Sequence, residues 1–447
     1  MRTVAFHTLG CKVNYYETEA VWQLFKKAGY KRVPFEEEAD VYVINTCTVT
    51  NTGDRKSRQV IRRAIRQNPE AVICVMGCYA QTSPQEVMAI EGVDIVIGTQ
   101  GREKILDYVE QYLRQRQPIN AVSNIMQARQ FEDLEVPNFS QRTRAYLKIQ
   151  DGCNNFCTFC IIPWARGLLR SRPPESVLDQ ARKLVAAGYQ EIILTGIHTA
   201  GYGEDLEDYS FARLLADLEQ IEGLKRIRIS SIEASQITDE VLDVLKQSRK
   251  ICRHLHIPLQ AGDDEVLKRM RRKYTTAEYK AKIDQVRQVL PDFALTSDVI
   301  VGFPGETEEQ FMNTYHFIRD LKFAELHVFP YSPRSGTPAA RMKDQIPPSI
   351  KQDRANRLIA LSEQLAKEYA SQFEGHILEV IPEQYLNQKQ KDVLMGYTDN
   401  YLRVAFKGDS RLMGKLVKVR IDQAGYPYQT GSLVQEEEVP HALYASS

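Results

Sequence analysis

The sequence predicts an α/β protein in three units: an N-terminal open parallel α/β sheet, a central partial (βα)6 barrel of the TIM type, and a small C-terminal antiparallel β-barrel. Apolar strands alternate with helical stretches through most of the chain, which is typical of parallel sheets. Near the C-terminus, glycines instead punctuate short β-rich runs. A length of 447 residues and a hydrophobic content of 43% suit two or three domains with sizeable cores.

Residues 1–115 are expected to form the N-terminal unit. The predicted strands are Thr3–Leu9, Val41–Asn45, Ala71–Met76 and Ile95–Ile97, and a helix is predicted over Tyr16–Ala28. Cys11, Cys47 and Cys78 each follow directly after one of the first three strands. Because ligands bind at the carboxyl ends of parallel strands, these cysteines are expected to converge although 67 positions separate the first from the last.

Residues 116–142 are expected to be a connector, and residues 143–373 a barrel unit. Six strands are predicted, at Ala145–Gln150, Glu191–Thr195, Arg226–Ser230, His254–Leu259, Ser297–Gly302 and Leu326–Pro330. Helices are predicted between them, and a final one near Ile350–Phe373 closes the unit. Six βα units favour a partial barrel over a complete eightfold one.

Residues 374–440 are expected to form the small β-barrel, a shape that often holds RNA. The segment 374–438 carries 8 Lys and Arg against 10 Asp and Glu, so its charge does not itself indicate RNA. Tyr397, Tyr401 and Phe406 are possible base-stacking surfaces, and each is equally suited to a core.

Composition limits the partners. The 58 basic and 58 acidic side chains cancel, so any nucleic-acid site must be a local patch, and no DNA-binding role is indicated. No stretch approaches the roughly 20 apolar residues of a membrane span, and the N-terminus is too polar for a signal peptide. We therefore expect a cytoplasmic protein, in which cysteine clusters more often bind metal or act in catalysis than form disulfides.

The strongest chemical signal is the CxxxCxxC run of Cys153, Cys157 and Cys160, directly after the first barrel strand. A 4Fe-4S cube normally takes four thiolates, so three leave one iron open. That iron can bind S-adenosylmethionine, and one electron from the cluster can then cleave it to a 5′-deoxyadenosyl radical. The alternative is a zinc knuckle, which needs a nearby fourth ligand that is not evident at a usual spacing.

The set of Cys11, Cys47 and Cys78 is weaker from spacing alone, because scattered buried cysteines are common. Their placement at strand ends makes a metal site about as probable as a set of core thiols. Cys74 and Cys252 have no partner at a metal spacing, and both are expected to be buried thiols.

S-adenosylmethionine is expected to bind at the ends of the barrel strands. The predicted contacts are Thr195 and Gly196 after the second strand, Ser231 and Glu233 after the third, and Gln260 after the fourth. Glycine lets the backbone approach a cofactor, although it equally serves a turn.

An RNA contact is predicted just after Cys47, where a basic run begins. On a helix, Arg55, Arg58, Arg62 and Arg66 share one face, and Ile61 and Ile65 share another. Such a stripe repels itself unless it meets an anion, although many basic runs are only solvated faces. The run Lys268–Lys273 is a second, weaker prediction.

Three motifs together resemble one enzyme family. Asn45-Thr-Cys47, Gly77-Cys-Tyr-Ala-Gln81 and the Cys153/Cys157/Cys160 loop are similar, in order, to the radical S-adenosylmethionine methylthiotransferases. The resemblance implies an N-terminal methylthiotransferase domain, a radical domain and a C-terminal TRAM domain. It also implies that Cys11, Cys47 and Cys78 hold an auxiliary 4Fe-4S cluster whose open iron carries the sulfur to be transferred.

Longer segments resemble the MtaB branch of that family: Asn45–Arg58, Ile161–Gly167 and Leu194–Gly203. That branch adds a methylthio group to carbon-2 of threonylcarbamoyladenosine, beside the anticodon of tRNA. The resemblance thus implies two 4Fe-4S clusters, S-adenosylmethionine, a tRNA substrate and an electron-donor protein. Arg166 and His198 flank the predicted cofactor loops and could read the threonylcarbamoyl group.

Three alternatives stay open. The same cysteine chemistry serves isopentenyladenosine in tRNA, or an aspartate of a ribosomal protein in a third branch. A non-catalytic iron–sulfur or zinc module that binds RNA is the last alternative, and it predicts no cleavage of S-adenosylmethionine.

Overall fold

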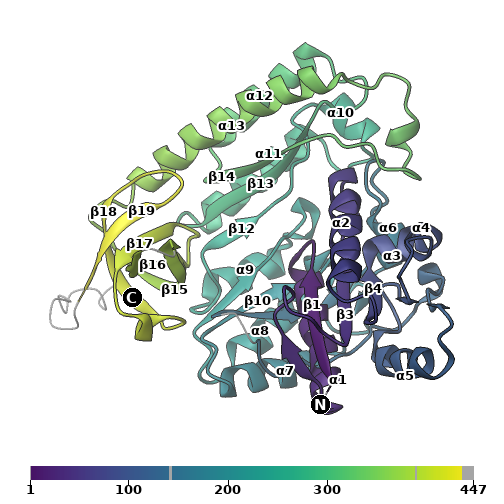
Figure 1. Cartoon of the computed structure of the whole chain (residues 1–447). Coiled ribbons are helices and arrows are strands. Elements are labelled where there is room, and N and C mark those ends of the chain that lie inside the picture. Colours follow the sequence, from purple (N-terminus) through teal and green to yellow (C-terminus); the bar gives the residue numbers. More distant parts are fainter. Residues whose placement is uncertain (1, 140–142, 388–389, 435–447) are drawn as a thin grey trace.

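The computed structural model describes residues 2–139, 143–387 and 390–434, and it has the predicted α/β class. Figure 1 shows the N-terminal unit on one side of the barrel strands and the C-terminal barrel on the other. Within these described ranges, no helix is both long enough and apolar enough to cross a membrane.

The N-terminal unit is a six-stranded parallel sheet in the order β2-β1-β3-β4-β5-β6. Its elements are β1 (Thr3–Thr8), α1 (Lys12–Lys27), β2 (Lys31–Val33), β3 (Val41–Thr46), α2 (Asn51–Gln67), β4 (Val72–Gly77), α3 (Cys78–Thr82), α4 (Pro84–Met88), β5 (Ile95–Val96), α5 (Ile105–Gln115) and β6 (Ile119–Asn120). Side chains alternate between two cores: α1 and α5 cover one face of the sheet, and α2, α3 and α4 cover the other.

Two local features differ from the sequence expectation. Helix α1 begins at Lys12, directly after Cys11, because the buried Asn14 amide donates to the carbonyls of Leu9 and Thr46 and holds the first turn against the strand ends. Strand β6 lies within the stretch expected to be a connector, where it pairs with β5 and extends the sheet.

The central unit has the six predicted strands in two three-stranded parallel groups, β7-β10-β11 and β12-β13-β14. Its strands are β7 (Ala145–Lys148), β8 (Gln150–Asp151), β9 (Arg170–Ser171), β10 (Glu191–Thr195), β11 (Arg226–Ile229), β12 (His254–His256), β13 (Ala294–Val301) and β14 (Glu325–Pro330). Its helices are α6 (Ile162–Arg166), α7 (Pro174–Ala186), α8 (Phe211–Glu219), α9 (Asp239–Gln247), α10 (Asp264–Arg269), α11 (Thr276–Val289), α12 (Glu308–Leu321) and α13 (Pro348–Ser371). A bridge between Ile227 and Ile251 joins the groups into a partial barrel.

The C-terminal unit is a closed barrel of β15 (Ile377–Asn387), β16 (Gln390–Thr398), β17 (Arg403–Lys407), β18 (Val417–Gln423) and β19 (Gln429–Leu433). All its pairings are antiparallel except that of β17 with β19. Arg226 and Arg228 of β11 donate to backbone carbonyls of Glu379 and Thr398, both at 2.8 Å, and fix this barrel against the central one. Phe406, proposed above as a stacking surface, is 1% exposed and belongs to the core of this barrel.

Candidate active site

The loop that carries Cys153, Cys157 and Cys160 follows β8 at the carboxyl end of the barrel strands. Gly152 has a φ of +75°, and a side chain there would clash with the carbonyl of Leu168. The turn therefore requires glycine. The backbone N–H of Asn155 points at the Cys153 sulfur at 3.5 Å, and a guanidinium N–H of Arg272 points at the Cys157 sulfur at 3.4 Å. Donors of this kind stabilise the negative charge of cluster-bound thiolates.

The structure brings Cys11, Cys47 and Cys78 together at the carboxyl edge of the N-terminal sheet, after β1, β3 and β4. Gly10 leaves room for Cys47, since a β-carbon at Gly10 would lie 3.2 Å from its sulfur. Arg166 of the barrel unit donates from Nε to the Cys78 sulfur at 3.2 Å. This arrangement again offers three sulfurs and a positively charged donor.

Burial raises the pKa of two of the three thiols in each set. The pKa of Cys78 rises to about 12 because of burial, with Arg166 acting against it and Cys47 and Cys11 adding to it. Burial also raises the pKa of Cys160 to about 12, and Cys157 and Cys153 add to that effect. Iron coordination would deprotonate such thiols, so both donor sets fit a cluster.

A cavity of about 250 Å3 lies between the CxxxCxxC loop and the segment that follows Cys47. Cys160 lines it from the radical loop, and Val49 and Thr50 line it just after Cys47. Gln260 and Asp298 close it from the barrel strands. Most of its remaining lining is apolar, which suits a planar base or the adenosine of a cofactor.

Of the predicted cofactor residues, Gln260 lines this cavity, and Glu233 lines another pocket together with Cys157. Gln260 lines the cavity with a φ of +69°, and its backbone pairs with Asp298 and Ile300 of β13. Glu233 forms an ion pair with Arg272, which also contacts Cys157. Ser231 stands just after β11 and is partly exposed.

Thr195 and Gly196 differ from those residues in their surroundings. Thr195 is 1% exposed, and its hydroxyl donates to the Ile193 carbonyl. A β-carbon at Gly196 would lie 2.9 Å from the Gln150 side-chain oxygen, so the glycine permits close packing of two loops. In this structure, Thr195 serves the backbone of its own strand.

Gln150 and Arg272 are neighbours of the cysteines that sequence reasoning missed. The Gln150 amide donates to the carbonyls of Asp151 and Gly152, and its oxygen accepts from the His198 N–H. It thus ties the cysteine loop to the loop after β10. Arg272 belongs to the run Lys268–Lys273 that was proposed as an RNA surface, but it and Arg269 point inward to protein partners. The basic character of the run was visible in the sequence, whereas its direction was not.

A buried ion-pair network joins the two cysteine units. Glu17 of α1 contacts Lys148 at 2.7 Å and Arg102 at 2.6 Å, and it also pairs with Arg166. Asp151 contacts Lys148 at 2.6 Å. Although burial opposes its charge, the pKa of Glu17 lies well below its ordinary value because of these three cations. Arg166 is therefore fully occupied between Glu17 and Cys78 and is not available to read a substrate side chain.

The predicted arginine stripe lies on α2, which begins at Asn51, four residues after Cys47. Arg55, Arg62 and Arg66 are exposed, and no hydrogen bond or ion pair to another described residue involves them. Arg58 donates to the Tyr79 hydroxyl at 3.0 Å. Ile61 is fully buried on the opposite face, as the periodicity predicted.

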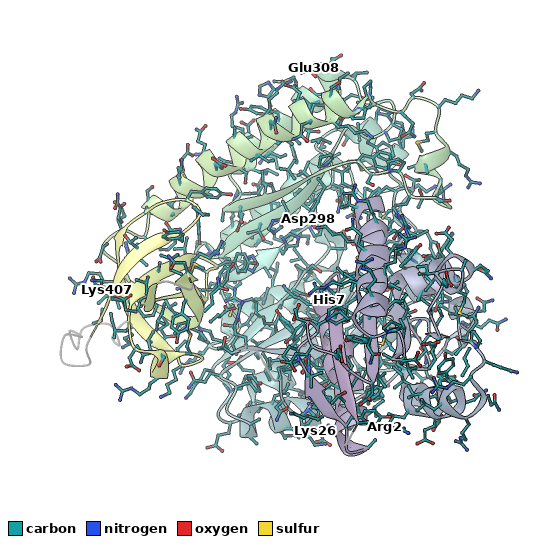
Figure 2. All side chains as sticks on the ribbon, in the orientation of Figure 1. Arg2, His7, Lys26, Asp298, Glu308 and Lys407 are labelled. Atoms are coloured by element: carbon teal, nitrogen blue, oxygen red, sulfur yellow. The ribbon has the colours of Figure 1, made fainter. Side chains whose placement is uncertain are left out.

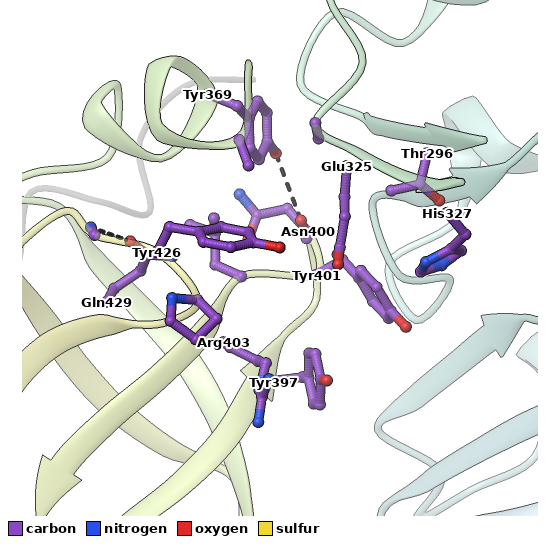
Figure 3. A pocket seen from close by; sticks show the side chains of 15 residues that line it. Thr296, Glu325, His327, Tyr369, Tyr397, Asn400, Tyr401, Arg403, Tyr426 and Gln429 are labelled. Carbon is purple, nitrogen blue, oxygen red and sulfur yellow. Dashed lines mark hydrogen bonds between the residues drawn. The ribbon is translucent and has the colours of Figure 1, made fainter. Parts of the chain in front are cut away.

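A cleft lined with tyrosines separates the C-terminal barrel from β14 (Figure 3). Tyr397 and Tyr401 stack with ring centroids 5.0 Å apart, and the Tyr401 ring stacks on His254 at 4.1 Å. Both tyrosines proposed as stacking surfaces thus line one cleft, and one face of Tyr401 is taken by His254.

Comparison with known families agrees with this geometry. The Radical SAM superfamily profile matches residues 147–318, and the profile of "Uncharacterized protein family UPF0004" matches residues 3–98. The chain is 66% identical, over 100% of both chains, to the threonylcarbamoyladenosine tRNA methylthiotransferase MtaB of Bacillus subtilis (strain 168). It is 37% identical to the tRNA-2-methylthio-N(6)-dimethylallyladenosine synthase of Carboxydothermus hydrogenoformans, over 96% of this chain and 98% of the relative.

Among solved structures, the radical S-adenosylmethionine methyltransferase TsrM of Kitasatospora setae shares the fold. Its TM-score is 0.58 at 15% identity, over 76% of this chain and 77% of that one. Membership of the radical SAM superfamily implies S-adenosylmethionine and a 4Fe-4S cluster as cofactors. The two cysteine sets and the full-length relatives, of which several are named methylthiotransferases, lead to the same conclusion: the chain belongs to the radical S-adenosylmethionine methylthiotransferase family.

Proposed function

We propose that this enzyme converts threonylcarbamoyladenosine beside the anticodon of tRNA to its 2-methylthio derivative. The observation that carries the proposal is the 66% identity to a threonylcarbamoyladenosine enzyme over both full lengths, against 37% for the dimethylallyladenosine enzyme. A tRNA substrate implies action in the cytoplasm. The chemistry requires one electron from outside the chain, and we assign its supply to an electron-donor protein.

We assign two 4Fe-4S clusters to the two cysteine sets. Cys153, Cys157 and Cys160 would hold one, and Cys11, Cys47 and Cys78 would hold the other. When bound, the first supplies the electron that cleaves S-adenosylmethionine and the second supplies the sulfur. The described geometry supports this assignment, because each set has a guanidinium on one sulfur, and one cavity is lined by Cys160 and by the residues that follow Cys47.

The protein's own residues would position the cofactor and exclude water. Gln260 shares a cavity with Cys160, Glu233 shares another with Cys157, and Ser231 precedes Glu233 in the loop after β11, so these three can donate to or accept from a bound cofactor. Gly196 would keep its loop close to Gln150, and Thr195 would act through the backbone of β10. The apolar lining between the cysteine sets would keep competing hydrogen donors away from the reacting carbon.

The test is product analysis with cluster-loaded enzyme, S-adenosylmethionine, a chemical reductant and tRNAs that carry either hypermodified adenosine. We expect a methylthio group on threonylcarbamoyladenosine only, detected by nucleoside mass spectrometry. Reaction on isopentenyladenosine alone would show that the proposed substrate is wrong. Formation of 5′-deoxyadenosine with neither RNA product would favour a protein substrate.

RNA binding by α2 gives a separate prediction. Replacing Arg55, Arg62 and Arg66 with alanine should weaken tRNA binding and flatten its dependence on salt. Each lost phosphate contact reduces the slope of log K against log[salt] by about 0.7 to 0.9, so three should reduce it by about 2 to 3. Fluorescence anisotropy across a salt series would measure the slope.

Arg114 on α5 provides the matched control for this experiment. It is exposed in the same unit and pairs only loosely with Glu110, at 3.4 Å. Its replacement by alanine should leave both affinity and slope unchanged. A triple variant on α2 with the wild-type slope would show that the stripe is only a solvated face.

A further inference from the structure

A second cavity, of about 200 Å3, lies inside the barrel beyond the apolar one. Lys12, Arg228, His254, His256 and His327 line it, with Asp298 as the acidic member. Asp298 also lines the apolar cavity, so the two spaces adjoin at this residue. Figure 2 labels Asp298 in the middle of the molecule, on β13. The charge of this cationic cavity comes from Lys12 and Arg228, since burial lowers the pKa of His254 well below its ordinary value.

Most of these groups already have protein partners. Arg228 donates to the Glu191 carboxylate and to the Thr398 carbonyl, both at 2.8 Å. His256 contacts the Asp298 carboxylate at 3.2 Å and the Thr296 hydroxyl at 2.9 Å. The carboxylate of Asp298 is therefore paired with a histidine, and the carboxylate of Glu191 is paired with arginines.

Lys12 has no such partner among the described residues. No hydrogen bond or ion pair joins its ammonium to any residue in the described ranges, although the side chain reaches into the cavity. As the first residue of α1, it also sits where the helix dipole disfavours a cation. Neither a local partner nor helix stability accounts for a lysine there, so an anion that enters the cavity is the simplest partner.

We propose that Lys12, assisted by His327, binds the carboxylate of the threonylcarbamoyl group and thereby selects the substrate. This inference rests on the proposed function. With adenine in the apolar cavity, the substituent on N6 would extend past Asp298 into the cationic one. An apolar dimethylallyl group in that place would leave a buried ammonium without a partner, and such unpaired groups reject an analogue strongly.

The position of Lys12 agrees with this role. It follows Cys11 directly, so the carboxylate would be held next to the cysteine set assigned to the sulfur-carrying cluster. His327 lines both the cationic cavity and the tyrosine cleft of Figure 3, together with Thr296 and Tyr401. The carboxylate pocket would therefore have the stacked tyrosines behind it.

The test measures binding rather than turnover. Anticodon stem-loops carrying threonylcarbamoyladenosine or its uncharged methyl ester are titrated against cluster-loaded enzyme without S-adenosylmethionine. We expect wild type to prefer the acid by about 10- to 100-fold, the range for a hydrogen bond to a charged group. Lys12→Met should remove that preference, and Lys12→Arg should retain most of it.

Two further variants test whether the effect of Lys12→Met on binding is indirect. Lys26→Met changes an exposed lysine at the other end of α1, which Figure 2 shows at the edge of the molecule, and it should behave as wild type. His327→Leu should reduce the preference for the acid, and it leaves the residue next to Cys11 unchanged. Iron content and the visible absorption spectrum of each variant report whether the clusters are intact.

The outcomes separate the inference from the function on which it rests. If Lys12→Met keeps the wild-type preference for the acid, the inference is wrong. The same holds if the substitution changes only the spectrum or the potential of a cluster. Loss of the preference in both Lys12→Met and His327→Leu, with clusters intact, would support it. Wild-type enzyme that forms no methylthio product on threonylcarbamoyladenosine in a parallel assay would instead overturn the proposed function.

Discussion

Replacing Cys153 with alanine is expected to abolish both cleavage of S-adenosylmethionine and methylthio transfer. Replacing Cys78 is expected to abolish transfer alone. The reason is the division of labour proposed for the two sets, in which only the first binds the cofactor that is cleaved. Each lost activity should fall below about one thousandth of wild type, as for other residues that act as a unit. Chromatography of 5′-deoxyadenosine and mass spectrometry of the tRNA nucleosides would measure the two activities separately.

Cys252 is the control for this comparison. It is 1% exposed in the barrel unit and is a buried thiol like Cys78, but it lies near Arg228 rather than near either set. Cys252→Ala should retain both activities. If Cys78→Ala also lost 5′-deoxyadenosine formation while keeping the iron of the first set, the proposed division between the two sets would be wrong.

Replacing Glu17 with glutamine should destabilise the enzyme by about 3 to 5 kcal/mol, the usual cost of breaking a buried ion pair from one side. Glu17 contacts Arg102, Lys148 and Arg166, so its loss leaves buried cations short of one negative charge. These contacts span α1 and the barrel, and Arg166 also contacts Cys78. Chemical denaturation of wild type and variant at neutral pH would measure the difference.

The pH dependence of that difference has a defined sign. Since the pKa of Glu17 is lower in the folded state, its contribution is present above the ordinary value of 4.5 and is lost as the pH falls below it. The gap between wild type and Glu17→Gln should therefore be largest at neutral pH and should shrink in acid. Glu110→Gln, which removes an exposed pair, should cost under about 1 kcal/mol at any pH. An equal gap at all pH values would contradict the assigned cause.

The local elements of the sheet and barrel could be predicted because their signals lie within short windows. The strands β1, β3 and β4 are apolar runs, and parallel pairing places Cys11, Cys47 and Cys78 at one edge whatever else surrounds them. The CxxxCxxC loop is likewise local. The short strands β2 and β6 were not predicted, because two or three residues with little burial give no periodic signal.

The direction of single polar side chains was not predictable in the same way. Arg58 and Arg62 belong to one predicted stripe, yet Arg58 donates to Tyr79 while Arg62 stays exposed. Arg272 and Phe406 also turned inward, one to a cysteine and one to a core. Each outcome depends on which distant residue the fold places opposite the side chain.

The sequence by itself therefore determined the fold class, the two cysteine sets and the family. Only the tertiary structure decided what surrounds them. Lys12, His256, Asp298 and His327 come from four separate elements and share one cavity, and Glu17 and Lys148 meet across 131 positions. The physical reason is that burial and pairing of charges are set by long-range packing, which leaves no periodic trace in the local sequence.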